Sequence, residues 1–292
     1  MIKQVRLQRH IDISQILILL VLFFLSLTFV LPIVITFSIS VSTPEGLLEQ
    51  NSGLLPRGFT LEAYKTILND PRVLRYYVNT IIYAVLGTII MLVLTSMLAY
   101  PLIDDKFSGK KIITVLLIIT MFFSGGLVPY YLLIRNLKMY NTIWAMILPG
   151  SISAWNVIVF KTFFIDLPKE LREAAYIDGA SHFITLFKII IPLSKPLFAT
   201  FALFSIVGYW NDYFTALIFL RDENKYPIAL LLRKMLVLLD GTDVKGRMMA
   251  LGLRNVNTRT AKSAAVIVTM LPIIMIYPSL QKYFTKGILR LN

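Results

Sequence analysis

The chain lacks cysteine altogether and has only two histidines among its 292 residues. Without cysteine, neither a disulfide nor a thiolate metal site can form. His10 and His182 lie far apart in the sequence, and neither belongs to a metal-ligand motif. The sequence therefore predicts no metal site, and each histidine is expected to be solvated or to lie at an interface.

Motifs of catalysis are missing as well. A phosphate-binding loop would read Gly-x-x-x-x-Gly-Lys-Ser/Thr, but Gly109-Lys110 is followed by Lys111 and lacks the earlier glycine. Neither Gly-x-Ser-x-Gly nor His-Glu-x-x-His occurs, and the few acidic residues are scattered. We therefore expect no enzyme activity and no cofactor on this chain.

Charge is also scarce, since 15% of the residues are charged and 57% are hydrophobic. Such a chain is too apolar for a soluble globule. Five of its six uncharged runs exceed the roughly 18 residues that cross a bilayer, and the sixth, 196–211, reaches that length only by continuing past Asp212 to Leu220. Continuous runs of this length exclude barrel strands, whose side chains alternate. We predict an all-α polytopic membrane protein with one domain over residues 1–292. The six expected transmembrane helices cover residues 13–39, 76–103, 112–134, 141–160, 196–220 and 263–281.

The positive residues predict an orientation. Lys106, Lys110 and Lys111 occupy a tight connection, and both ends of the chain are basic, which is typical of the cytoplasmic side. Both termini and the loop 161–195 are therefore expected inside, and the loop 221–262 outside. The first helix is interpreted as a retained span and not as a signal peptide. The net charge of +13 is attributed to topology and anionic lipid, not to nucleic acid.

The polar loop 161–195 predicts two short helices. Pro168 suits a first helical position, and the following residues favour a helix up to Asp178. Gly179 fits the left-handed position that ends a helix, and Ser181 can cap a second helix that Pro192 ends. Two short helices that meet at a glycine form a stiff knob, which transmits displacement where a flexible loop would absorb it.

The same loop resembles the Glu-Ala-Ala loop of permease subunits of ATP-driven (ABC) importers. The residues that carry this resemblance are Glu173, Ala174, Ala175, Asp178, Gly179, Ala180, Phe187, Ile189 and Pro192. The resemblance implies that the knob fits a cleft on a separate ATPase, where ATP and Mg²⁺ are bound. The small Ala174 and Ala175 are expected to permit close approach of that partner.

The resemblance extends along the chain. Asn79, Ala99-Tyr100, Asn141-Thr142 and Trp210-Asn211 are similar to carbohydrate-type permeases, of which the second maltose permease is an example. The run 123–129 resembles an oligo- and polysaccharide branch that includes the alginate importer. This implies a type I importer fold in a bacterial cytoplasmic (inner) membrane. The implied partners are a second homologous permease in a heterodimer, two ATPase subunits and an extracytoplasmic solute-binding protein.

Candidates for the translocation pathway lie in the predicted fifth helix and in a glycine pair of the third. The former are Tyr209, Trp210, Asn211 and Asp212, and the latter are Gly125 and Gly126. An acid inside a span normally faces a polar cavity or a partner, and aromatic rings with amides suit sugars. The alternative is that Asp212 lies near the outer interface within an aromatic belt. The glycines are either a packing kink or a break in the pathway.

The predicted outer loop 221–262 holds nine Lys/Arg against four Asp/Glu, a net charge of +5. Its candidate contact residues are Arg233, Lys234, Lys245, Arg247, Arg254 and Arg259. A basic loop suits an acidic binding protein or an anionic saccharide such as a uronate polymer. The alternatives are contact with lipid headgroups and local ion pairing.

Two other classes remain open. An ion-driven secondary transporter would use Asp212 as its ion site, but it would leave the knob without a role. A membrane enzyme or scaffold would need no partner ATPase. Copurification of an ATPase distinguishes the first interpretation from both.

Overall fold

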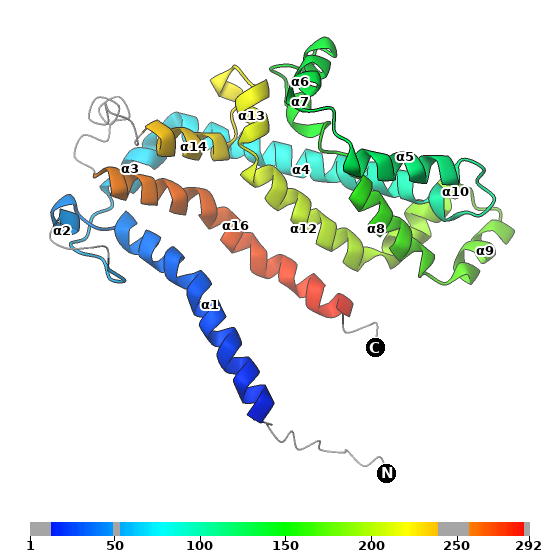
Figure 1. Cartoon of the computed structure of the whole chain (residues 1–292), viewed down its shortest axis with the longest axis horizontal. Helices are drawn as coiled ribbons and strands as arrows, with labels where there is room; N and C mark the ends of the chain where they lie inside the picture. Colours follow the sequence, from blue (N-terminus) through cyan, green and yellow to red (C-terminus); the bar gives the residue numbers. More distant parts are fainter. Residues whose placement is uncertain (1–12, 49–52, 239–256, 289–292) are drawn as a thin grey trace. The chain divides into compact units, whose positions relative to one another are not determined.

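The computed structural model describes residues 13–48, 53–238 and 257–288, and this part of the chain is helical without strands (Figure 1). It forms two compact units. Unit 1 holds the described residues up to Ile67, Leu238 and those from 257 to Val268, and unit 2 holds Leu68–Val237 and the described residues from Thr269. The all-α prediction is confirmed, whereas the single domain over 1–292 stays a prediction.

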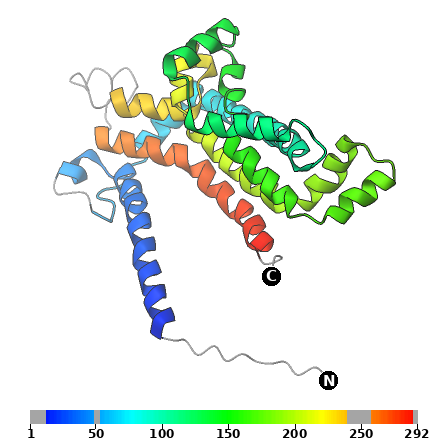
Figure 2. The ribbon, with the colours of Figure 1, turned by 45° about the vertical axis from the view of Figure 1, so that its right-hand side comes forward.

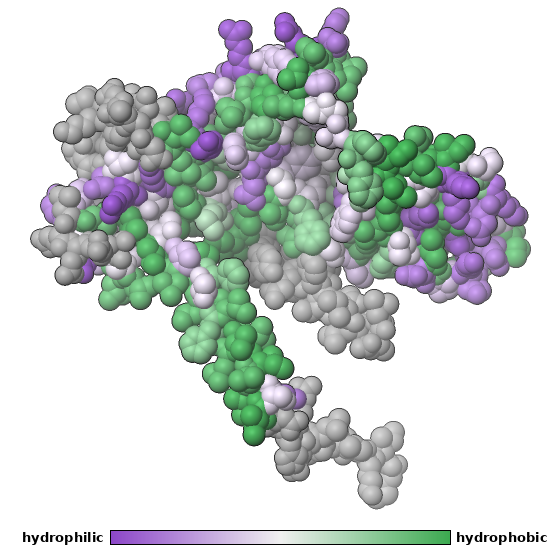
Figure 3. Space-filling view, in the orientation of Figure 1, coloured by the Kyte–Doolittle hydropathy of each residue, from purple (hydrophilic) through white to green (hydrophobic). Residues whose placement is uncertain are grey.

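Unit 1 contains the first long helix, α1 (Ile13–Ser40), which includes Pro32 without breaking. Its side chains are apolar and exposed along most of its length (Figure 3), as expected for a helix that faces lipid. The short helices α2 (Pro44–Leu48) and α3 (Glu62–Asn69) follow. The Ser40 and Tyr64 hydroxyls share a hydrogen bond of 2.6 Å, and Thr260 Oγ1 donates to the Ser42 carbonyl over 3.2 Å.

Unit 2 is built along α4 (Pro71–Ala99), whose first turn is capped by Asp70 and begins with Pro71. The helix α12 (Lys195–Asn211) runs beside it in both views, and α7 (Ile143–Ile147) and α8 (Ala154–Ile165) also pack on α4 (Figures 1 and 2). The helices α5 (Lys110–Phe122), α6 (Leu127–Asn136), α9 (Lys169–Ile177), α13 (Phe214–Phe219) and α14 (Ile228–Leu238) complete this region.

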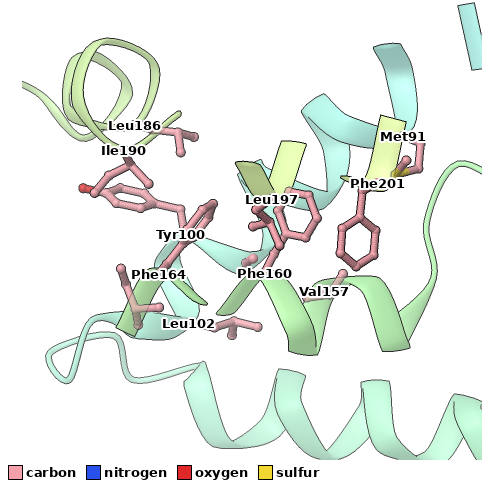
Figure 4. Close-up of a cluster of buried hydrophobic side chains, with 12 residues drawn as sticks. Met91, Tyr100, Leu102, Val157, Phe160, Phe164, Leu186, Ile190, Leu197 and Phe201 are labelled. Carbon is pink, nitrogen blue, oxygen red and sulfur yellow. The ribbon is translucent and has the colours of Figure 1, made fainter. Parts of the chain in front are cut away.

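One hydrophobic cluster runs through unit 2. Phe160 is fully buried, and its ring centroid lies 5.0 Å from that of Phe201 and 5.2 Å from that of Phe198. Figure 4 shows Met91 near Phe201 at one end of this cluster, and Leu186 and Ile190 near Tyr100 at the other. Close-packed interiors deform little, so the two ends of the cluster are mechanically connected.

The six predicted spans are not confirmed as six long helices. Among the described helices, three are long and apolar enough to cross a membrane: α1, α4 with the 3₁₀ turn Pro101–Ile103, and the part Thr258–Met275 of α16 (Thr258–Ile288). A fourth span results if the helices 182–193 and α12 count together, although they are bent by 83°.

Three other predicted spans are broken, two of them at glycine or proline residues and the third at Asp212-Tyr213. The predicted 112–134 helix is interrupted between α5 and α6, where Gly126 has φ +82°. The predicted 141–160 helix divides into α7 and α8 around Pro149-Gly150, and the predicted 196–220 helix divides into α12 and α13. Breaks of this kind persist in membranes where neighbouring groups satisfy the freed backbone.

Candidate functional site

Helix α4 carries a polar region at each of its ends. We name residues 169–193 the knob, which adjoins the C-terminal end at Tyr100. We name Asn141 and residues 219–228 the clamp, which binds side chains in the N-terminal half of the helix. The clamp contacts α4 at Asn79 and Tyr83, which at ~1.5 Å per residue lie about 32 and about 26 Å before Tyr100 along the helix axis, a distance comparable with the ~30 Å hydrocarbon core of a bilayer.

The first helix of the knob, α9, ends as the sequence predicts. Gly179 has φ +79°, a conformation that glycine adopts without steric cost. The Asp178 N–H donates to the Ala174 carbonyl, and the Ala180 N–H donates to the Ala175 carbonyl over 2.9 Å. Pro168 differs slightly from the prediction, because it precedes α9 as its N-cap and Lys169 is the first helical residue.

The second helix of the knob is capped as predicted but ends later. Ser181 Oγ accepts a hydrogen bond from the Ile184 N–H over 3.3 Å, which starts α10 (His182–Thr185). The chain continues through the π-helical segment Leu186–Ile190 into α11 (Ile191–Leu193). The helical stretch therefore ends one residue after Pro192, where it bends by 83° into α12.

The exposure of the predicted coupling residues is mixed. Glu173, Ala174, Asp178, Gly179, Phe187 and Pro192 are exposed, Ala180 is half-buried, and Ala175 is buried. Ala175 is only 6% exposed, so its side chain packs within this chain, and its role in the close approach of a partner stays a prediction. The burial follows from its place on the inner face of the short helix α9.

Sequence analysis missed the most exposed apolar side chains of the knob. Ile177 is 86% exposed and Phe183 is 64% exposed, although both lie in a polar segment. Ile177 and Phe183 add to the expected coupling surface, which stays a prediction. The signal was present in the sequence, since Ile177 directly precedes Asp178-Gly179.

A chain of side-chain hydrogen bonds joins the knob to α4. The Tyr100 and Tyr176 hydroxyls lie 2.8 Å apart, and the Tyr176 hydroxyl lies 3.0 Å from His182 Nδ1. Tyr100 ends α4, Tyr176 lies on α9 and His182 begins α10. This network fixes both short helices to the end of the long one.

A cavity of about 740 Å³ lies beside this network. Its walls come from the end of α4, the connection 104–107, α9 and α10. Asp105 forms an ion pair with Lys110 over 2.7 Å, and this partner lowers the pKa of the Asp105 carboxyl. Figure 3 shows the hydrophilic surface over α9 and α10. The knob therefore has exposed apolar side chains within a hydrophilic surface.

A second cavity, of about 350 Å³, lies in unit 2 among α4, α8 and α12. The residues that line it include Met91, Asn156, Phe204, Ser205, Gly208 and Asp212. Asp212 occupies the break between α12 and α13, where its carboxylate accepts a hydrogen bond from the Thr215 N–H over 3.0 Å. This carboxylate borders the cavity and also starts the next helix.

Of the other pathway candidates, one lines this cavity and the rest do not. Tyr209 lines the cavity, and its hydroxyl donates to the Ile147 carbonyl over 3.0 Å. Trp210 is 3% exposed and donates from Nε1 to the Thr269 carbonyl over 3.0 Å, so it holds helices together. Asn211 is exposed and donates to the Val207 carbonyl of its own helix. Gly125 and Gly126 lie in the break before α6 and line neither of these two cavities.

The clamp is a dense set of polar contacts. Asn79 Nδ2 donates to the carbonyls of Asn224 and Tyr226 over 2.8 and 3.0 Å, and the Tyr83 hydroxyl donates to the Lys225 carbonyl over 2.6 Å. Thr80 Oγ1 accepts from the Ile228 N–H over 2.8 Å. Each contact joins a side chain of α4 to the backbone of the clamp.

Asn141 holds the clamp from the other side. Its Oδ1 accepts from the backbone N–H groups of Arg221 and Asp222 over 3.1 and 3.0 Å, and its carbonyl accepts from Lys225 Nζ over 2.7 Å. Its φ of +59° is a conformation that asparagine tolerates better than most residues. The asparagine that resembled a family position is thus the centre of a turn.

The basic residues expected to contact a binding protein are partly engaged within the chain. Lys234 Nζ lies 2.9 Å from Glu223 Oε1 and 4.3 Å from the centroid of the Tyr226 ring, and the lysine lowers the pKa of the Glu223 carboxyl. The Arg233 guanidinium lies 5.7 Å from the Tyr213 ring. For Lys234, local ion pairing therefore explains the positive charge without a binding protein. Lys245, Arg247 and Arg254 lie outside the described residues.

Known proteins resemble this chain along almost its whole length. A family described as the binding-protein-dependent transport system inner membrane component matches residues 11–290. Protein LplC of Bacillus subtilis (strain 168) is 40% identical over 89% of this chain and 88% of its own. The polygalacturonan/rhamnogalacturonan transport system permease protein YtcP of the same organism is 36% identical over 89% and 91%.

A solved structure has the same fold. It belongs to a bacterial ABC transporter involved in the import of the acidic polysaccharide alginate, and the similarity covers 94% of this chain and 98% of that one. The TM-score is 0.84 at 30% sequence identity. The predicted type I importer fold and the resemblance to the polysaccharide branch are therefore confirmed.

Proposed function

Since the chain belongs to the family of binding-protein-dependent transport system inner membrane components, we propose that it forms one permease half of an oligosaccharide importer whose cargo is acidic. It is a multi-pass membrane permease subunit of a sugar ABC importer, and it is not an enzyme. ATP and Mg²⁺ belong on two separate ATPase subunits. The membrane is the bacterial inner membrane, with both termini in the cytoplasm.

The observation that carries this proposal is the construction of the knob. Ile177, Phe183 and Phe187 expose apolar side chains on a rigid helix pair, and these side chains provide a surface for the cleft of an ATPase. When ATP closes the two ATPases, the knob would move as one body.

The path from the knob to the cavity is continuous. Leu186 and Ile190 of the knob belong to the same hydrophobic cluster as Met91 and Phe201, and those two residues line the 350 Å³ cavity. A displaced knob would therefore move the cavity walls. Uptake follows if the ATP-bound state opens the cavity outward and the state after hydrolysis opens it inward, with different affinities for the cargo.

The acidic cargo is supported by the relatives. YtcP is named for polygalacturonan and rhamnogalacturonan, and the matching structure comes from an importer of acidic alginate. A neutral oligosaccharide is the second candidate, because the melibiose/raffinose/stachyose import permease protein MelC of Bacillus subtilis is 30% identical over 73% of the chain. Uptake assays with charged and neutral oligosaccharides decide between them, and a preference for neutral sugar would exclude the acidic cargo.

The remaining partners follow from the opposite end of α4. A solute-binding protein would dock on the outer side, near the clamp and the basic loop 221–262, where opposite charge speeds encounter. A second, homologous permease would complete the cavity as a heterodimer. An ion-driven transporter is less well supported, since it leaves the knob without a role.

The test is to replace Glu173 with lysine in the assembled transporter. Glu173 is exposed on α9, so reversal of its charge should uncouple ATP hydrolysis from uptake while the chain still folds. Glu62→Lys makes the same charge change on the exposed side of α3 and should leave uptake unchanged. Full uptake by Glu173→Lys without any copurifying ATPase would exclude this function.

A further inference from the structure

The 350 Å³ cavity has a composition that suits sugar hydroxyl groups. Asn156 and Ser205 are half-buried at its wall, and Phe204 lines it with a side chain that is 56% exposed. Small-molecule sites commonly combine an apolar surface with a few convergent polar groups. An aromatic face beside an amide and a hydroxyl provides a stacking surface together with hydrogen-bonding groups.

Gly208 gives this cavity its room. It lies inside α12, where glycine destabilises a helix relative to alanine, and its φ is not in the left-handed region. A Cβ placed at Gly208 would meet no atom within 4 Å, whereas one at Gly87 would lie 2.3 Å from Tyr209 Cζ. Packing therefore requires glycine at Gly87, while at Gly208 the missing side chain leaves open space.

The charge of the wall is negative. Asp212 is the one ionisable acid among the residues that line this cavity, and no lysine or arginine of the described chain lines it. A cargo carboxylate against this wall would be repelled, whereas a sugar hydroxyl could donate to the carboxylate.

We infer that Asn156, Ser205, Gly208 and Asp212 form the saccharide-contacting wall that this chain gives to the translocation pathway, and that this wall takes sugar hydroxyls and excludes carboxylates. The inference rests on the proposed function. If the cargo is acidic, its carboxylates face away from this wall during passage, so recognition of the acid group belongs to another part of the transporter.

The absence of cysteine from the chain permits a test that needs no identified sugar. Gly208→Cys and Asn156→Cys are introduced separately into the assembled transporter, which is treated with cationic and anionic water-soluble methanethiosulfonates without nucleotide and with trapped ATP. Both thiols should react. When the rate of each reagent is divided by the rate of the same reagent with a free thiol in solution, the cationic reagent should be at least fivefold faster than the anionic one. Asp212→Asn should reduce that ratio to about one.

Two controls keep the result interpretable. Ala216→Cys occupies a fully buried position and should stay unmodified. The second control is a series of larger side chains at Gly208, tested with oligogalacturonides and with their neutral methyl esters. Gly208→Ala should retain uptake of both forms. Gly208→Leu and Gly208→Phe should reduce uptake of both forms at least tenfold, while the ATPase still copurifies.

The wall is excluded if neither thiol reacts in either state, if the anionic reagent is as fast as the cationic one, or if Gly208→Phe imports like the unchanged chain. These outcomes leave the proposed function intact as long as an ATPase copurifies. Absence of an ATPase from an active transporter contradicts the proposed function itself.

Discussion

The two ends of α4 satisfy their polar and apolar groups in different ways. At the clamp, side chains of α4 and Asn141 bind backbone groups of the same chain at 2.6–3.1 Å. At the knob, Ile177 and Phe183 stay exposed. The polar groups of the clamp are therefore satisfied within this chain, whereas the knob leaves apolar side chains exposed for the ATPase contact proposed above. A region of the first kind supports stability, and a region of the second kind supports assembly.

The largest effect on stability is expected from Asn141→Leu in the clamp. It removes two hydrogen bonds, each worth about 1 kcal/mol, and places leucine at a positive φ for about 1 kcal/mol more. We expect a loss of about 3 kcal/mol in the free energy of unfolding, measured by thermal unfolding of the purified transporter. Asn141→Asp keeps the acceptor and should lose less. If Asn141→Leu were as stable as the unchanged chain, the hydrogen bonds of Asn141 would not be what stabilises the clamp.

The next largest effect is expected at the knob, on assembly and not on folding. Ile177→Ser removes a side chain that contacts water in this chain, so its stability should change by less than about 0.5 kcal/mol. Loss of an apolar contact with the ATPase should weaken binding at least tenfold, or about 1.4 kcal/mol. Titration of the ATPase measures this affinity. Leu74→Ser, on an exposed position of α4, is the control that should leave it unchanged.

A smaller effect is expected where the knob meets α4. Tyr176→Phe deletes the hydroxyl that lies within hydrogen-bond distance of Tyr100 and His182, so the helices should stay assembled but transmit movement less well. We expect a several-fold fall in sugar imported per ATP hydrolysed, with unchanged ATPase content. Tyr131→Phe, on a ring that stacks on Phe219, serves as the control. An unchanged ratio in Tyr176→Phe would exclude this network as a link.

The smallest effect is expected from the ion pair between Glu223 of the clamp and Lys234. Glu223 is partly exposed, so Lys234→Gln should cost less than about 1 kcal/mol, and salt should reduce the difference. Because Lys234 lowers the pKa of Glu223 in the folded chain, this contribution is present above the ordinary carboxyl pKa and is lost as the pH falls through the lowered value. Thermal unfolding between pH 7 and pH 3 measures it, and an unchanged difference between the two chains at pH 3 contradicts the assignment.

Local signals in the sequence predicted much of the knob and less of the cavity. Gly179 and Ser181 ended and capped helices as expected, because these preferences depend on a few neighbouring residues. Ala175 was expected to permit close approach of a partner, and the burial of its side chain could not be read from the sequence because packing decides it. Trp210 was a pathway candidate, but its Nε1–H donates a hydrogen bond to the carbonyl of Thr269, a residue 59 positions away.

The sequence by itself determined the class of the protein: an all-α membrane chain without cysteine or a phosphate-binding loop, with a stiff polar knob. Composition, hydrophobic run length and short-range capping carry that information, and none of them depends on distant contacts. The tertiary structure alone decided that Asn141 closes a clamp, that Gly208 opens a cavity and that Tyr176 joins two helices to α4. These roles depend on which side chains meet across tens of residues, and that is set by packing of the whole unit.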